Sequence, residues 1–174
     1  MKIYLKDAAI TTLKFIFLIF IATATFIVNS RILLWANIPT GSMIPTIPEH
    51  SLVLGTRYDA DKINRYDIVI FKYPDDETQT YIKRVIGMPG ETIRIRVGKV
   101  YADGKLIDDA FTAELSADDG EYKVPEGCYF MMGDNRNHSI DSRFWMRKYV
   151  EEEKIMAKAK FLIYPFHHFG SLKY

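Results

Sequence analysis

The sequence predicts a mainly β protein in which an antiparallel, barrel-like β domain follows one N-terminal transmembrane helix. Two patterns predict this fold class. A continuous apolar run lies near the N-terminus, and after Pro39 come short segments in which β-branched or aromatic residues alternate with polar ones. The 174 residues are enough for one compact domain with such an appendage.

The first predicted element is a membrane anchor over residues 8–30. Its only charged residue is Lys14, and about 20 helical residues cross a hydrocarbon core of roughly 30 Å. A cleavable secretory signal is an alternative, because the small residues Ala22-Thr23-Ala24 follow a basic start and an apolar run. A buried helix of a soluble core fits less well, because the run has no polar face.

The charges that flank the apolar run predict its orientation. Three lysines lie toward its amino side and one arginine follows it closely: Lys2, Lys6, Lys14 and Arg31. By the positive-inside rule, residues 1–7 are cytoplasmic and residues 31–174 form the extracytoplasmic domain of a single-pass plasma-membrane protein. The lipid bilayer is therefore a predicted partner.

Seven later segments have the pattern of strands. They are residues 51–57, 67–73, 80–88, 92–97, 99–101, 128–132 and 154–164. Asp103-Gly104 predicts a tight hairpin turn, and Pro89-Gly90 predicts another between Ile86 and Ile93.

The last strand and the acidic segment before it have opposite patterns. Alternate residues place Ile155, Ala157, Ala159, Phe161 and Ile163 on one face of the strand, with Lys158 and Lys160 on the other. Residues 102–126 are acidic and lack apolar periodicity, which predicts a solvated loop or extended hairpin without chemistry of its own.

Composition excludes several classes of function. The 23 basic and 22 acidic residues give a net charge of +1, so no nucleic acid partner is predicted. The single cysteine, Cys128, excludes an internal disulfide and a Cys-rich zinc site. The four histidines lack metal-binding spacing, and no serine lies in a Gly-x-Ser-x-Gly elbow, so neither a metal, a cofactor nor a histidine triad with His50 or His138 is predicted.

Three other segments contain residues suited to catalysis. Prolines bracket Ser42 in residues 39–46, which fixes its geometry but is also typical of a juxtamembrane linker. Lys83 lies in a strand rich in β-branched residues. If the Lys83 side chain points inward, burial favours its neutral amine. If Arg84 is the inward residue, Lys83 is solvated. Residues 132–143 are rich in Asp, Ser and Arg, as in an active-site support or an Asx-rich turn.

Together these segments resemble the ordered boxes of the bacterial type I signal peptidases, membrane-bound serine endopeptidases that remove signal peptides from exported proteins. The matching boxes are Ser42-Met43-x-Pro45-Thr46, Asp67-Ile68-Val69, Lys83-Arg84-Val85-x-Gly87-x-Pro89-Gly90-Glu91, and Gly133-Asp134-Asn135-Arg136 with Ser139-x-Asp141-Ser142-Arg143. The chain is similar to the minimal, single-anchor members, although Tyr66 stands where many members have glycine.

The resemblance implies a role for each matching residue. Ser42 would be the nucleophile and Lys83 the general base. The backbone N–H of Ser42 and the hydroxyl of Thr40 would form the oxyanion hole. Ser139 would orient the lysine amine. Two ion pairs would support the site: Asp134 with Arg84, and Asp141 with Arg143.

The resemblance also implies signal peptides of exported preproteins as the substrate partner and leaves the oligomeric state open. Two other classes stay open. One is a catalytically silent, membrane-tethered β-domain scaffold or chaperone. The other is a repressor-type self-cleaving serine-lysine protease, which would carry a DNA-binding helical domain in place of the span.

Overall fold

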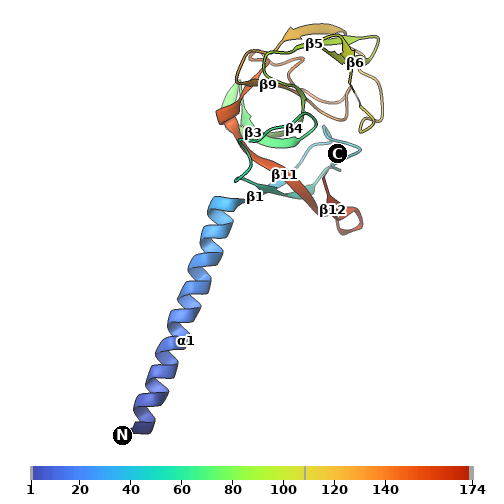
Figure 1. The fold of residues 1–174 in the computed structure, drawn as a ribbon. Coiled ribbons are helices and arrows are strands. Elements are labelled where there is room, and N and C mark those ends of the chain that lie inside the picture. Colours follow the sequence, from blue (N-terminus) through green and yellow to red (C-terminus); the bar gives the residue numbers. More distant parts are fainter. Residues whose placement is uncertain (1, 108, 173–174) are drawn as a thin grey trace.

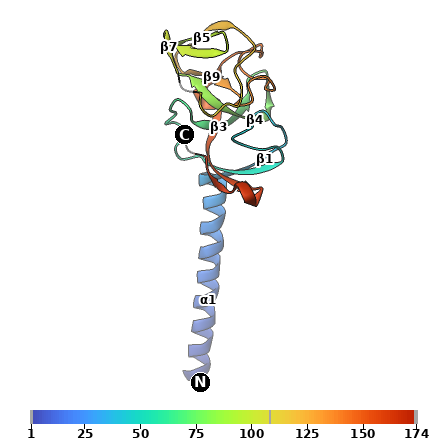
Figure 2. The same cartoon turned by 90° about the vertical axis from the view of Figure 1, so that its right-hand side faces the viewer.

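In the computed structural model, which describes residues 2–107 and 109–172, one long helix leads into a β domain (Figure 1). Helix α1 (Lys2–Ile27) continues as a π-helical turn (Val28–Ile32) and reaches the first strand without a linker. In the described part of the chain, one helical stretch, Ile10–Ile32, is long and apolar enough to cross a membrane, and none of it is covered by the β domain. The helix stands away from the domain in both views (Figures 1 and 2).

The larger of two antiparallel sheets has eight strands, in the order β1-β2-β11-β3-β4-β9-β10, with β12 paired to β11. The strands are β1 (Leu33–Ile38), β2 (Ser51–Thr56), β3 (Ile68–Tyr73), β4 (Asp76–Gly87), β9 (Cys128–Met132), β10 (Val150–Glu151), β11 (Ile155–Tyr164) and β12 (Gly170–Ser171). Short 3-10 turns at Glu152–Lys154 and Phe166–His168 flank β11.

The smaller sheet has four strands, in the order β7-β6-β5-β8. They are β5 (Thr92–Arg96), β6 (Lys99–Ala102), β7 (Lys105–Leu106) and β8 (Gly120–Lys123). This sheet lies at the end of the domain farthest from α1 (Figures 1 and 2). The mainly β fold with one N-terminal apolar helix is thus as predicted.

All seven predicted strands are present, and most of their ends differ from the prediction by one residue at most. Strand β4 is the exception, because it begins four residues early, at Asp76. The Asp103-Gly104 hairpin is confirmed: β6 pairs with β7, and both turn residues have positive φ. Strands β1, β7, β8, β10 and β12 were not predicted as separate elements.

Two predictions about strand geometry are wrong. Pro89-Gly90 forms a turn, but it connects strands of different sheets, β4 and β5, and closes no hairpin. The predicted alternation along β11 holds only as far as Ala159, because a bulge between Ala159 and Phe161 shifts the register. Phe161 is therefore exposed and Leu162 is buried, since an extra residue reverses the faces that follow it.

The prediction of a solvated loop or extended hairpin over residues 102–126 is wrong in part. Strand β8 pairs with β5, and its four residues lie opposite Thr92–Ile95. Phe111 and Ser116 are buried, which ties the segment to the domain although its composition is acidic. Local periodicity could not predict these contacts, because they join residues that are far apart in the sequence.

Candidate active site

A cleft of about 870 Å³ opens on one side of the larger sheet. Its walls come from β1, from the middle of β4, and from residues 138 and 140. Ser42 and Lys83 both line it, so the structure brings together the two residues that the sequence singled out first. Most of the other lining side chains on β1 and β4 are apolar, among them Leu34, Ile38 and Ile82.

Ser42 is held by the segment that follows β1. Its neighbour Met43 and nearby Ile47 are fully buried in the core, and the Ile47 N–H donates to the Met43 carbonyl at 2.9 Å. Asn135 binds this segment from the opposite side: its side chain donates to the Gly41 carbonyl at 3.0 Å and its N–H donates to the Ser42 carbonyl at 3.1 Å. These contacts fix the position of the Ser42 hydroxyl.

Lys83 reaches Ser42 from β4. Its Nζ lies 2.6 Å from Ser42 Oγ, and the two residues are only 4% and 7% exposed. Burial lowers the pKa of Lys83 to about 8, although Asp141 and Asp134 oppose that shift through their negative charges. A substantial fraction of the amine is therefore neutral at mildly alkaline pH and able to accept a proton.

Arg84, the next residue of β4, is also buried and pairs with Asp134 as predicted. Arg84 Nε and Nη2 donate to the two carboxylate oxygens at 2.8 and 2.6 Å. Thr46 donates to the same carboxylate at 2.5 Å. The sequence pattern assigned no role to Thr46, although its place in the Ser42 box was the available signal. The Asp134 carboxylate thus joins Thr46, on the segment of Ser42, to Arg84 on the strand of Lys83.

The carbonyl of Tyr66 accepts a further hydrogen bond from Arg84 Nη1, at 2.9 Å. Tyr66 has φ of 74°, a conformation that favours glycine. This backbone geometry explains why glycine suits the position, and the ring contact of Tyr66 with Phe111, at 5.6 Å between centroids, is specific to the tyrosine.

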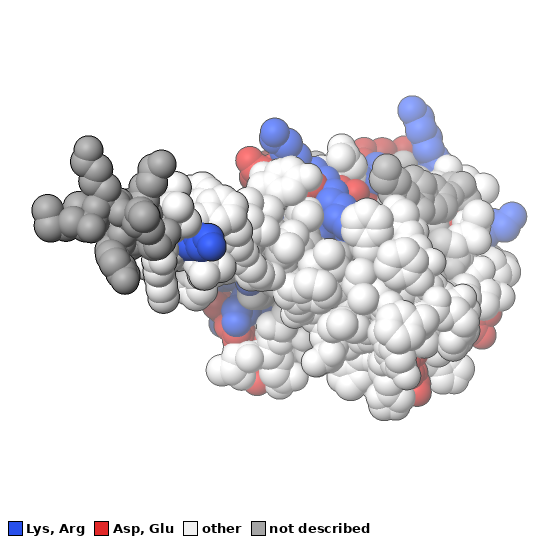
Figure 3. Space-filling view, turned by 90° about the horizontal axis from the view of Figure 1, so that it is seen from below, with Lys and Arg blue, Asp and Glu red and all other residues white. Residues whose placement is uncertain are grey.

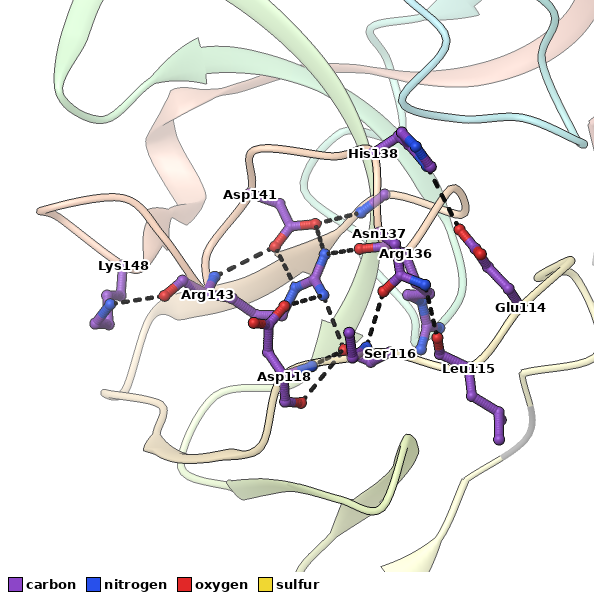
Figure 4. A network of polar contacts seen from close by, with 12 residues as sticks. Glu114, Leu115, Ser116, Asp118, Arg136, Asn137, His138, Asp141, Arg143 and Lys148 are labelled. Atoms are coloured by element: carbon purple, nitrogen blue, oxygen red, sulfur yellow. Dashed lines mark hydrogen bonds and ion pairs between the residues drawn. The ribbon is translucent and has the colours of Figure 1, made fainter.

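The second predicted ion pair, between Asp141 and Arg143, lies at the centre of a larger network (Figure 4). Arg143 Nε and Nη2 donate to Asp141 at 2.8 Å each, and Asp141 also accepts from the Gly133 N–H at 2.9 Å. Ser116 accepts from Arg143 Nη1 at 2.9 Å. The acidic segment therefore contributes to the support of the site through Ser116, a contact that the sequence pattern did not predict.

The predicted contact of Ser139 with the lysine amine is absent. Ser139 Oγ is buried and has no hydrogen-bond partner among the described residues. It lies instead against Gly133, where an added Cβ would come within 2.3 Å of Ser139 Oγ and 2.4 Å of the Ser42 carbonyl. Thr40 is exposed at the edge of the cleft, two residues before the serine.

A buried serine hydroxyl in contact with a lysine amine, at the floor of a cleft in a β domain, defines the class of serine-lysine hydrolases. The chain belongs to the signal peptidase family, peptidase S26, whose pattern matches residues 9–164.

Similar sequences agree with this assignment. The chain is 34% identical over 161 residues to the probable signal peptidase I-2 of Synechocystis, covering 87% of this chain and 70% of that protein. It is 32% identical over 146 residues to signal peptidase I of Bacillus caldolyticus, with coverage of 74% and 78%. A crystal structure of a signal peptidase I from Enterococcus faecalis V583 aligns with a TM-score of 0.49 at 31% identity, covering 56% of this chain and 96% of that one.

Proposed function

We propose that this chain is a membrane-bound serine endopeptidase that removes N-terminal signal peptides from exported proteins. The observation that carries the proposal is the 2.6 Å contact between Lys83 Nζ and Ser42 Oγ inside the cleft. A scaffold or chaperone would not need a lysine buried against a serine hydroxyl, since burying an ammonium without a carboxylate partner is unfavourable.

The proposed reaction begins with neutral Lys83. Its amine takes the proton of Ser42 as Oγ bonds to the carbonyl carbon of the scissile peptide. The C–N bond then breaks, and the Lys83 ammonium returns the proton to the leaving amine. Water, deprotonated by the same amine, attacks the acyl ester, releases the signal peptide and regenerates Ser42.

Thr40 and the backbone N–H of Ser42 are the proposed oxyanion hole. They lie on the same short segment, and Thr40 lines the cleft beside the serine. Donors fixed before the reaction stabilise the negative charge that develops on the carbonyl oxygen. The two buried ion pairs, Arg84 with Asp134 and Arg143 with Asp141, position the reacting groups and take no part in the chemistry.

The substrate is proposed to bind in an extended conformation along the cleft, with small residues at the positions one and three before the cut. Mostly apolar walls formed by β1 and β4 suit such a segment. Replacing either small residue with Phe or Asp should suppress cleavage. Equal cleavage of the replaced substrates would contradict this specificity.

Residues 8–30 are the proposed anchor, with residues 1–7 in the cytoplasm and residues 31–174 outside. The face of the β domain that surrounds α1 is largely uncharged, with charged side chains mainly toward its rim (Figure 3). The turn between β11 and β12 lies at the level where α1 meets the domain (Figures 1 and 2), and there Phe166 and Phe169 are 77% and 64% exposed. Aromatic side chains at this level suit a membrane interface. External protease should digest the β domain of intact cells; a protected β domain would reverse the orientation.

The decisive experiment for the activity is cleavage of a synthetic signal peptide by the full chain in detergent, with product termini identified by mass. We expect one cut after the small residue, and no cut by Ser42→Ala prepared in parallel. Substantial cleavage by Ser42→Ala would remove Ser42 from the mechanism.

A further inference from the structure

The connection between the anchor and the β domain is short and fully structured. Helix α1 ends at Ile27, the π-helical turn ends at Ile32, and β1 begins at Leu33. Residues 28–38 contain neither glycine nor proline, unlike a flexible linker. The direction of the sheet relative to the helix is therefore set by the contacts within this connection.

Asn29 makes two of these contacts with its side chain. Its Nδ2 donates to the Thr25 carbonyl at 3.1 Å, in the last turn of α1. Its Oδ1 accepts from Trp35 Nε1, in β1, at 3.3 Å. One amide thus joins the end of the helix to the first strand.

Arg57, which follows β2, binds the connection at a second point. Its N–H donates to the Ile32 carbonyl at 2.8 Å, and its Nε donates to the Leu33 carbonyl at 3.2 Å. These bonds continue the ladder between β1 and β2, which starts at Leu33 opposite Thr56. The strand is therefore held to the sheet from the residue at which the helix ends.

The same residues also form part of the cleft. Trp35 and Arg57 both line it, and the Trp35 side chain is half exposed. The apolar helical stretch ends at Ile32, so Trp35 lies just beyond it, at the level that tryptophan favours in membrane proteins. From Trp35 the chain needs seven further positions to reach Ser42. One rigid stretch of chain thus contains, in order, the end of the span, a wall of the cleft and the nucleophile.

We infer that the Asn29–Trp35 contact is a positioning device that holds the cleft at one height and angle above the bilayer. This inference rests on the proposed function. A signal peptide places its own apolar segment in the same bilayer, so the bond to be cut reaches Ser42 only if the intervening residues span that height. Each extended residue adds roughly 3.3–3.6 Å. Asn29 and Trp35 would then select preproteins by the distance between apolar segment and cleavage site.

The test uses the full chain in liposomes and a series of preproteins that differ only in the number of residues between apolar segment and cleavage site. Asn29→Leu removes both hydrogen bonds at similar side-chain size. Ser30→Ala is the matched control, because among the described residues Ser30 Oγ bonds only to the Ile27 carbonyl, at 3.4 Å, within the same turn. Each variant's rates are divided by its own rate on a short soluble signal peptide in detergent, which corrects for any loss of folded enzyme.

We expect the wild type and Ser30→Ala to show a narrow length optimum, with kcat/KM falling roughly tenfold or more away from it, because small misplacements of the reacting bond are costly. Asn29→Leu should flatten the profile, and so should Trp35→Phe, which keeps a ring but removes the indole N–H. A length profile in both variants that matches the wild type would overturn the inference. Failure of the wild type to cut the soluble peptide would instead contradict the proposed function.

Discussion

Two buried lysines lie in the same row of the larger sheet and differ in what faces their amines. Lys158 on β11 and Lys83 on β4 are both register partners of Val69, which lies between them on β3. They are 6% and 4% exposed. Lys158 Nζ lies 2.7 Å from a carboxylate oxygen of Asp67, whereas Lys83 Nζ lies 2.6 Å from the Ser42 hydroxyl and makes no ion pair with a described residue.

The comparison shows that burial alone does not make a lysine into a base. Burial disfavours the ammonium at both positions, and a carboxylate in direct contact offsets that cost at one of them. At Lys83 the acidic residues Asp134 and Asp141 act only from a distance, and its pKa falls to about 8. The partner of the amine therefore distinguishes the structural Lys158 from Lys83, the proposed general base.

The largest expected difference between the two regions is in turnover. Lys83→Met should lower kcat by roughly 10⁴-fold or more, because it removes one member of a unit that works together. Folded Lys158→Met enzyme should keep most of the wild-type activity per molecule. The measurement is signal-peptide cleavage per folded enzyme. An equal loss in both variants would show that the two lysines act alike.

The second prediction concerns the Thr40 hydroxyl, which lies on the segment of Ser42. Thr40→Ala should lower kcat by about 10²- to 10³-fold, the scale for one oxyanion donor, while Thr40→Ser should lose little. Steady-state kinetics on one peptide separates kcat from KM. If Thr40→Ala cleaves like the wild type, the side chain lies outside the oxyanion hole.

Stability should change in opposite directions when each lysine is replaced. At neutral pH, Lys83→Met should raise the free energy of unfolding by up to about 3 kcal/mol, less any packing loss, because the ammonium is buried without an ion-pair partner among the described residues. Lys158→Met should lower it by roughly 1–2 kcal/mol, because Asp67 loses its ion pair and is itself partly exposed. Urea titrations of both variants would check the signs. Destabilisation by both substitutions would contradict the distinction between Lys83 and Lys158.

The smallest expected effect is at Ser139. Its buried hydroxyl has no hydrogen-bond partner in the part of the chain that the structure describes, so Ser139→Ala should change the free energy of unfolding by less than about 1 kcal/mol. A loss of several kcal/mol in a urea titration would mean that the hydroxyl is bonded after all.

The sequence predicted the elements and residues whose signals are local. Alternation located seven strands, and the Ser42 and Lys83 boxes identified the two residues that meet in the cleft. Pattern alone could not choose whether Lys83 or Arg84 points inward. The structure buries both, because this part of β4 is covered on both faces.

The remainder depended on tertiary contacts. The bulge in β11 reversed the predicted exposure of Phe161, since register is set by the neighbouring strands. Ser116 meets Arg143 across 27 positions of sequence, and nothing in the composition of the acidic segment indicates this contact. The same holds for Lys158, whose partner Asp67 lies on another part of the chain.

The most direct test of a neutral, buried Lys83 is the pH dependence of stability and rate measured together. The pKa is lowered from 10.5 to about 8, so between these values the unfolded chain binds more protons than the folded one, and stability rises with pH. Below about pH 8 the full penalty is present. The advantage of Lys83→Met over the wild type should therefore be constant below about pH 8 and shrink toward pH 10.5, while wild-type cleavage rises with pH to a plateau above about 8. A stability difference that stays the same at every pH up to 10.5, with a cleavage rate that lacks this basic limb, would contradict the account.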